Sequence, residues 1–421
     1  MKVKMTTIAA AIALSTSFVV NAAPVTDPNN LDYVGAQASP PSYGVDNNTT
    51  FLDDGAWPSP LPMPMPFNAT GGGTFSSELS SMPGSSAALG DNDSVIDQTT
   101  ASGLPQSGNA ASVMQGNGTQ NDSYIRQNKL SSGDTMEVEV EQSGNNNHSD
   151  VVQDLNYGAT SKVYQTGDGH RSRVTQLGDH SNKAEVQQNG SAQRSIIEQG
   201  TKPGGADSNT ASVFQSNMNN ESFVRQQWDS NDATVIQFGN NGTSKVWQQS
   251  DNNIAFLSQG GSDNSSSIRQ GVTGSSDNNF AFVVQDGSDN NSSIQQEGGD
   301  ANIAGTLQIG NDGQSSIFQN GAGNIAGVAQ FGVGDVSMVI QEGDSKTALV
   351  LQTGVGIAGV EFNESYILQK GTGAHTALVV QDHAPASGWN NVSTITQLNS
   401  ANGNATVFQS GAGNRASTIQ Y

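Results

Sequence analysis

The chain has 421 residues, 33% hydrophobic and 13% charged, and its 16 Lys and Arg against 38 Asp and Glu give a net charge of −22. So acidic a protein repels nucleic acid and anionic membrane surfaces, and neither is expected as a partner. Leu, Ile, Val and Phe make up roughly a fifth of the chain, which argues against an ordinary enzyme built from several apolar cores.

Residues 1–22 have the pattern of a cleaved secretory signal. Lys2 and Lys4 precede an apolar stretch at residues 8–20, and small residues at 20–22 offer a cleavage site. The stretch is too short to span a bilayer, so we expect a secreted protein without a membrane span. The chain has no cysteine, which excludes disulfides as a source of stability.

Residues 23–90 are rich in Pro, Gly and Ser and show little hydrophobic periodicity. Ten of the 13 prolines lie at or before Pro83, and five of them alternate between Pro58 and Pro66. Alternating prolines favour polyproline II and remove amide donors, which predicts a disordered leader. Two roles remain open for it, a recognition tail for a secretion or anchoring partner and a plain spacer.

Residues 91–421 contain a short internal repeat marked by 27 glutamines, from Gln98 to Gln420. Of the 26 intervals between them, 14 are 11 residues long and six are 12. The residue two before the glutamine is Val or Ile in 24 cases. The residue four before it alternates between Ser and Ala, so the repeating unit has about 22 residues and two strands.

The residues at these offsets share one face of a strand, because successive side chains point to opposite sides. Asn also stands six before the glutamine in 17 of the 27 strands, and Gly two after it in 15 of the 26 turns. A coil of two strands cannot bury its apolar face alone, so the coils must stack. The sequence therefore predicts an all-β, two-strand-per-coil β-solenoid of about 13 coils.

Small Ser and Ala suit a thin interior, and identical amides stacked in register can bond each carbonyl to the NH₂ of the next coil. Without such partners a buried amide costs roughly 1–3 kcal/mol. We expect the structural ladder to include Ser292, Gln296, Asn302, Ala304, Gln308, Ser315, Ile317, Gln319, Gly321, Asn324, Ala326, Val328, Gln330, Ser337, Gln341, Gln352, Gln409 and Gln420.

No catalytic, cofactor or metal site is predicted. The histidines lack metal-ligand spacing and are expected at the surface: His148, His170, His180, His375 and His383. Asp- and Asn-rich turns such as 288–291 lack the Gly-Gly-x-Gly-x-Asp repeat of calcium β-rolls, which leaves calcium only as a weak alternative.

Outward strand positions differ along the chain. Those between residues 91 and 270 include charges expected to restrain lateral aggregation: Arg126, Glu139, Lys162, Arg173, Glu185, Arg225, Lys245 and Arg269. Those between 302 and 381 are expected to be mostly apolar: Ile303, Leu307, Phe318, Ile325, Met338, Ile340, Leu349, Leu351, Ile367, Leu368 and Val380. The C-terminal half, with these apolar outward residues, either assembles more readily than the rest of the chain, or its apolar outer face is merely tolerated within a fibre.

The pattern Ser-x-(Val/Ile)-x-Gln-x-Gly-x-x-Asn-x-Ala-x-Val-x-Gln, complete at residues 315–330, resembles the repeat of the curlin family, the subunits of bacterial curli fibres. The resemblance implies an extracellular functional amyloid of biofilm matrix and cell adhesion, a homopolymer at the cell surface with a nucleator subunit and an outer-membrane secretion channel as partners. The repeat region and the leader are longer than those of familiar curlins. This leaves open whether the chain is a major, an accessory or a nucleator subunit.

Two rival functions are weaker. A monomeric adhesin that binds ice or glycans would need a flat outward array of Thr or aromatics, and the outward residues vary from coil to coil. A solenoid enzyme such as a polysaccharide lyase would need Asp clustered with Arg or Lys in a groove, and the sequence shows no such cluster. We therefore predict a structural, non-enzymatic subunit that adds end to end, since no segment after Gln420 would cover the last strand.

Overall fold

The computed structural model describes residues 92–100, 109–129, 135–154, 158–178, 181–200, 208–271, 277–354, 362–383, 390–398 and 401–421. The predicted signal at 1–22 and the predicted leader at 23–90 lie outside the described residues.

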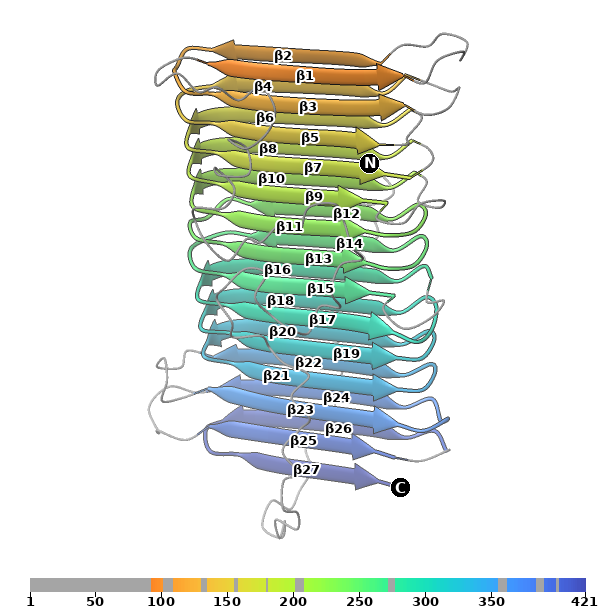
Figure 1. Cartoon of the computed structure of the whole chain (residues 1–421). Helices are drawn as coiled ribbons and strands as arrows, with labels where there is room; N and C mark the ends of the chain where they lie inside the picture. Colours follow the sequence, from red (N-terminus) through yellow and green to blue (C-terminus); the bar gives the residue numbers. More distant parts are fainter. Residues whose placement is uncertain are drawn as a thin grey trace, which may run out of the picture. The chain divides into compact units, whose positions relative to one another are not determined.

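The described residues form 27 β-strands and no helix, with one strand for each of the 27 periodic glutamines. Each strand pairs in parallel with the strand two places along the chain, so odd-numbered and even-numbered strands lie in separate sheets (Figure 1). This confirms the predicted all-β, two-strand-per-coil β-solenoid. A membrane-spanning helix is absent from the described residues.

The chain divides into two compact units, one with β1–β15 and one with β16–β27. The odd strands of the first unit are β1 (Asp93–Thr100), β3 (Asp122–Lys129), β5 (His148–Asp154), β7 (Arg171–Leu177), β9 (Arg194–Gln199), β11 (Glu221–Gln226), β13 (Thr243–Gln248) and β15 (Ser265–Gln270). Its even strands are β2 (Ala110–Gly116), β4 (Glu137–Ser143), β6 (Thr160–Asp168), β8 (Lys183–Ser191), β10 (Thr210–Met218), β12 (Asp232–Gln237) and β14 (Ile254–Gln259).

The second unit repeats the same arrangement. Its odd strands are β17 (Asn291–Glu297), β19 (Gln314–Asn320), β21 (Val336–Glu342), β23 (Asn363–Lys370), β25 (Asn391–Gln397) and β27 (Arg415–Gln420). Its even strands are β16 (Phe280–Ser288), β18 (Ile303–Asn311), β20 (Ile325–Val333), β22 (Thr347–Gly354), β24 (Thr376–His383) and β26 (Asn404–Gly411).

The pairing register places like residues on like residues. Between β19 and β21, Ser315 pairs with Ser337, Ile317 with Val339 and Gln319 with Gln341. Between β18 and β20 the Ala, Thr/Val and Gln positions align in the same way. A slip of one residue would turn each interior set outward, so the interior pattern fixes this register.

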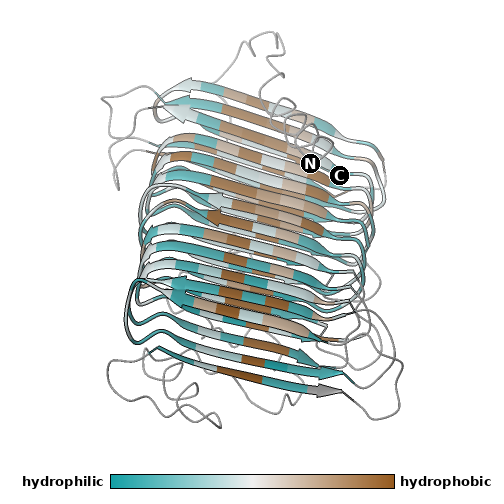
Figure 2. Cartoon of the chain, turned by 90° about the horizontal axis from the view of Figure 1, so that it is seen from above, coloured by the Kyte–Doolittle hydropathy of each residue, from teal (hydrophilic) through white to brown (hydrophobic). Residues whose placement is uncertain are grey.

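The interior side chains are the ones that the repeat predicts. Ile317 and Val328 are at most 2% exposed, and Ala304 and Ala326 at most 3%. Hydrophobic residues occupy the middle of the strands, whereas the strand ends and turns are hydrophilic (Figure 2). The core of each coil is therefore a short apolar segment flanked by buried polar side chains.

One assignment of an outward residue is corrected, and several residues that do point outward are buried. Ile367 was expected outside but is a core residue, because it stands two before Gln369 and so shares the interior face. Phe318 and Ile340 do point outward, yet both are buried. The same is true of several charged residues on the odd-numbered strands, including Arg173 and Arg225.

Candidate functional site: the buried amide ladders

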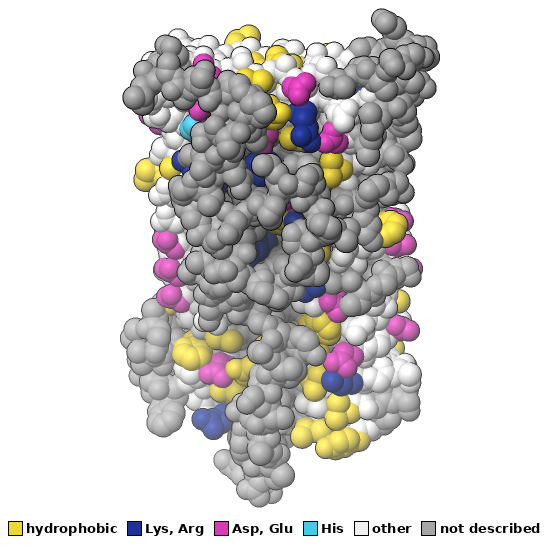
Figure 3. All heavy atoms as spheres, viewed as in Figure 1, with side chains coloured by type: hydrophobic (Ala, Val, Ile, Leu, Met, Phe, Trp, Pro, Cys, Tyr) yellow, Lys and Arg dark blue, Asp and Glu magenta, His cyan; other side chains and the backbone are white. Residues whose placement is uncertain are grey.

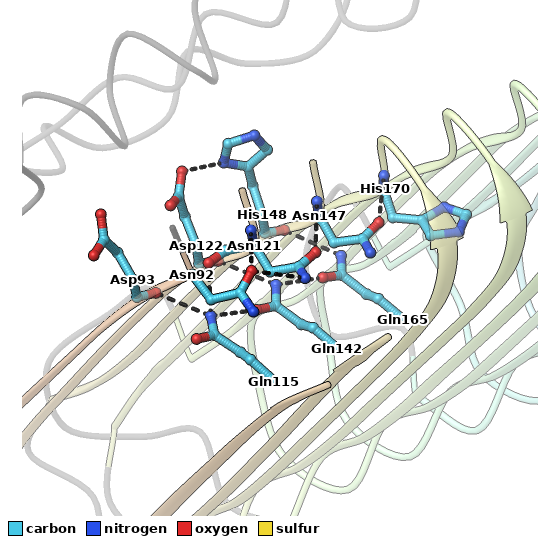
Figure 4. Close-up of polar contacts among 10 residues, drawn as sticks. All are labelled: Asn92, Asp93, Gln115, Asn121, Asp122, Gln142, Asn147, His148, Gln165 and His170. Atoms are coloured by element: carbon cyan, nitrogen blue, oxygen red, sulfur yellow. Dashed lines mark hydrogen bonds and ion pairs between the residues drawn. The ribbon is translucent and has the colours of Figure 1, made fainter. Parts of the chain in front are cut away.

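Within each unit, buried glutamines form a hydrogen-bonded column inside each sheet. In the first unit, Gln115 Nε2 donates to Gln142 Oε1 at 2.9 Å, and Gln142 Nε2 donates to Gln165 Oε1 at 2.8 Å (Figure 4). Gln142 is 1% exposed, and the next glutamines of this column are equally buried. The register of identical residues thus supplies each buried amide with an identical partner.

The second unit holds two such columns, with Nε2 to Oε1 distances of 2.7–2.9 Å. One column runs along the even strands through Gln285, Gln308, Gln330, Gln352, Gln381 and Gln409. The other runs along the odd strands through Gln296, Gln319, Gln341, Gln369, Gln397 and Gln420. The structure therefore brings together all the glutamines predicted for the ladder.

Most of the ladder glutamines also tie the two sheets to one another. Gln319 on β19 donates a second hydrogen bond, at 3.0 Å, to the carbonyl of Ile303 on β18. Gln330 on β20 does the same to the carbonyl of Gln314 on β19, also at 3.0 Å. Both hydrogens of the amide are thereby used, which removes the desolvation cost of burying it. The sequence pattern did not reveal this cross-sheet bond.

The columns have a direction. In each Gln–Gln bond of the second unit, the coil nearer the N-terminus donates Nε2 and the next coil accepts with Oε1. A coil consequently presents acceptors to the coil before it and donors to the coil after it. An identical coil can extend the column only in the same orientation.

In the predicted asparagine ladder, the asparagine side chains bond to backbone groups more than to one another. Asn302 Oδ1 accepts from the backbone N–H of Asn324 at 3.0 Å, and Asn324 Oδ1 accepts from the N–H of Lys346 at 3.0 Å. Asn302 Nδ2 donates to the Gly299 carbonyl in its own turn at 3.0 Å. Since any residue other than proline has a backbone N–H, this position tolerates replacement in the following coil, as Lys346 shows.

The serines that stand four residues before the ladder glutamines contribute to the interior mainly through their small size. Ser315 Oγ lies 3.0 Å from Thr306 Oγ1. By contrast, these buried hydroxyls on the described odd strands have no hydrogen-bond partner: Ser123, Ser149, Ser195, Ser222, Ser292, Ser337, Ser365 and Ser393. A small side chain here lets the sheets approach, and the even strands use Ala at the same place, as at Ala304 and Ala326.

We predict that Ser337→Ala raises the free energy of unfolding by about 1 kcal/mol, because it removes a buried hydroxyl that has no partner. Urea unfolding followed by circular dichroism measures the change. A loss of stability of similar size would show that the hydroxyl forms a stabilising bond.

Gly321 follows the ladder glutamine by two residues and forms the turn after β19. Its φ of +125° lies in a region that favours glycine. A Cβ at this residue would overlap the carbonyl of Gly343, the equivalent residue of the next coil. The turns thus stack as closely as the strands, and this position requires glycine.

Ionisable residues occupy several asparagine positions and are buried there. His170 is fully buried, its backbone N–H donates to Asn147 Oδ1 at 3.0 Å, and burial lowers the pKa of its imidazole. Lys346 is also fully buried, its ammonium donates to the carbonyls of Gly371 at 2.7 Å and Gly373 at 3.1 Å, and burial lowers its pKa.

Asp335, 3% exposed, stands at another asparagine position, before β21. Its Oδ1 accepts from the backbone N–H and from Nδ2 of Asn363, both at 3.0 Å, while its Oδ2 is buried without a partner. Burial raises the pKa of Asp335 to about 6, against the lowering effect of the two Asn363 hydrogen bonds and of nearby His383. The folded chain therefore holds the Asp335 proton more tightly than the unfolded chain does.

A raised pKa makes this carboxyl stabilising in acid and destabilising at neutral pH. Between the unfolded pKa of 3.8 and the folded pKa of about 6, the folded state binds more protons, so stability falls as the pH rises. The difference between the two pKa values corresponds to a loss of about 3 kcal/mol in the free energy of unfolding over this pH range. We predict that Asp335→Asn removes this pH-dependent component and is more stable than the wild-type chain at pH 7.5.

Paired urea titrations at pH 4 and pH 7.5 test this, because other titrating groups cancel in the difference between the two proteins. A stability difference that does not change with pH would contradict the burial of an unpartnered Oδ2.

The surface placement expected for the histidines is wrong for three of them. His170, His375 and His383 are at most 3% exposed, the first two because they replace interior asparagines. His148 is half-buried and its Nδ1 lies 3.0 Å from Asp122 Oδ2 (Figure 4). His180 lies outside the described residues. Among the described residues, no group of three or more His, Asp or Glu side chains is arranged to hold a metal ion.

No protein-family model matches the chain, and no curated protein matches its sequence. The geometry of the ladders is therefore the basis for the functional proposal.

Proposed function

We propose that this chain is a structural subunit of an extracellular, curli-like amyloid fibre, which assembles by adding coils in register to the ends of the amide columns. The observation that carries the proposal is the direction of these columns. Gln330, for example, accepts from Gln308 and donates to Gln352, so its coil has one face for a preceding coil and another for a following coil. A second copy can use the same two faces.

The backbone favours the same mode of addition. In-register parallel pairing repeats from coil to coil, and among the described strands β26 and β27 each pair with one strand only, so that a strand of the same pattern can add at their outer edges. A further copy would then gain strand hydrogen bonds and would extend both glutamine columns. The partner proposed for the fibre is a second copy of this chain.

The proposed role is structural and not catalytic. The polar groups of the ladder bond to each other and to the backbone, as in the three bonds of Gln319, so they are not available to a substrate. The resemblance of its repeat to curlin suggests that the protein acts at the cell surface, in biofilm matrix and cell adhesion. We propose that it is exported through an outer-membrane channel and that a nucleator subunit starts its assembly.

Seeded assembly tests the proposal. Residues 23–421 are purified in denaturant, diluted into neutral buffer and followed by thioflavin T fluorescence with and without sonicated fibres of the same chain. We expect a lag phase that seeds abolish, and fibres in negative-stain micrographs. A soluble β-rich monomer that neither assembles nor responds to seeds would favour a monomeric adhesin or an accessory subunit.

A further inference from the structure

The outer face of the odd-numbered strands β7–β15 is basic, although the chain as a whole has a net charge of −22. Six of the 16 Lys and Arg of the chain stand at outward positions of these five strands: Arg171, Arg173, Arg194, Arg225, Lys245 and Arg269. With Glu198 and Glu221 as the acidic residues there, the face carries 6 − 2 = +4. We call it the basic face.

The even strands β8–β14 of the same unit provide a comparison. Their outward positions hold Lys183 with Glu185 and Asp232, which gives 1 − 2 = −1. The net positive charge of this part of the unit therefore lies on the odd-numbered strands. Figure 3, viewed as Figure 1, shows Lys and Arg side chains in dark blue on the side of the odd strands.

Aromatic rings lie among the cations of the basic face. The Arg225 guanidinium lies 5.2 Å from the ring centroid of Phe223 and 5.9 Å from that of Trp247, and the Arg269 guanidinium lies 5.0 Å from Trp247. Three of the six cations form ion pairs within the sheet: Arg225 with Glu198 at 2.6 Å, Arg173 with Asp150 of β5 at 2.8 Å and Arg194 with Glu221 at 3.2 Å. A ligand of this face would therefore be recognised by negative charge together with aromatic or proline rings.

These side chains point outward and are nevertheless shielded from solvent. Trp247 is 1% exposed, Phe223 5% and Lys245 7%. On the even strands the outward Phe214 and Phe256 are only half-buried. Packing within the sheet contributes to this shielding, since Trp247 pairs with Arg225 on one side and with Arg269 on the other.

The leader has the complementary chemistry. Residues 23–90 contain five Asp, one Glu and no Lys or Arg, together with six aromatic residues and ten prolines. They precede β1, which belongs to the same odd-strand sheet as the basic face. From β1 to β15 is about 34 Å at the usual strand spacing, whereas 68 residues extended as polyproline II cover about 200 Å.

We propose that the acidic, aromatic leader at residues 23–90 binds the basic face of β7–β15 of its own chain. Its carboxylates lie against the arginines and Lys245, and its prolines and aromatic rings cover Trp247 and Phe223. The contact does not depend on fibre assembly. It keeps a basic surface away from the acidic surfaces of other copies and so limits side-to-side association.

Zero-length cross-linking tests the contact in the full chain, residues 23–421. A carbodiimide joins an amine to a carboxylate that touches it, so we expect Lys245 to be linked to a leader carboxylate. The matched control is Lys183 on β8, which is exposed on the other sheet and should form no link to the leader. An equal mixture of ¹⁴N- and ¹⁵N-labelled chains distinguishes links within a chain from links between chains.

A second measurement uses a variant with Trp247 as its single tryptophan, made by W57F, W228F and W389F. Quenching of Trp247 by acrylamide should increase severalfold when the six leader acids become amides (D27N, D32N, D46N, D53N, D54N and E78Q). Unchanged quenching together with no Lys245 link would overturn the proposal. Mixed-isotope links would assign the face to a second copy. Binding of alginate to the full chain that the six substitutions leave unchanged would assign it to an acidic polymer.

Discussion

Replacing Gln330 by Leu is expected to lower the free energy of unfolding by about 3–6 kcal/mol. The leucine fills a similar volume but leaves Gln308 Nε2, Gln352 Oε1 and the Gln314 carbonyl without the bonds that Gln330 makes at 2.8, 2.9 and 3.0 Å. Each buried polar group left unpaired costs about 1–3 kcal/mol. Guanidinium unfolding monitored by circular dichroism measures the loss.

The matched control is Gln314→Leu, the same substitution at an exposed outward position of β19. It should change stability by less than about 0.5 kcal/mol. Equal effects of the two substitutions would mean that the column at Gln330 contributes nothing specific.

Gly321→Ala is expected to cost at least about 3 kcal/mol. The added Cβ would meet the backbone carbonyl of Gly343 in the next coil, and the φ of +125° is unfavourable for alanine. Because the obstacle is backbone, relief requires the turns to move apart and opens the pairing of β19 with β21. Hydrogen exchange should therefore accelerate first in these two strands.

Gly323→Ala, in the same turn, controls for the loss of a glycine. Its φ is +65° and the nearest atom to an added Cβ is 3.9 Å away, while the equivalent residues Ala301 and Ser345 are not glycines. We expect a cost of about 1 kcal/mol or less. A larger effect for Gly323→Ala than for Gly321→Ala would show that turn stacking does not limit the spacing of the coils.

The periodic glutamines were enough to predict the fold. The offsets of two and four residues before each glutamine placed Ile317, Val328 and Ala304 inside, and the alternation of Ser and Ala separated the two sheets. The reason is physical, since parallel in-register stacking requires that each coil repeat the residues of the last one. The same offset rule also identifies Ile367 as interior.

The offset rule also places in the interior residues whose side chains are not typical of a protein core. His170, Asp335 and Lys346 stand six before a glutamine, which makes them interior whatever their side chain, although His170 was expected at the surface. The backbone-directed bonding of Asn302 could not be predicted, because it depends on the geometry of the turn. Nor could the burial of Trp247, which depends on how Arg225 and Arg269 of the neighbouring strands pack against its ring.

X-ray fibre diffraction from aligned fibres of residues 23–421 tests most directly whether copies stack in register. The account predicts a meridional reflection at about 4.7–4.8 Å, because strands lie across the fibre axis, and an equatorial reflection near 10 Å from the two sheets. It also predicts that the Gln330→Leu chain assembles more slowly under the same conditions. A protein that forms no fibres, or fibres whose meridian lacks this reflection, would contradict it.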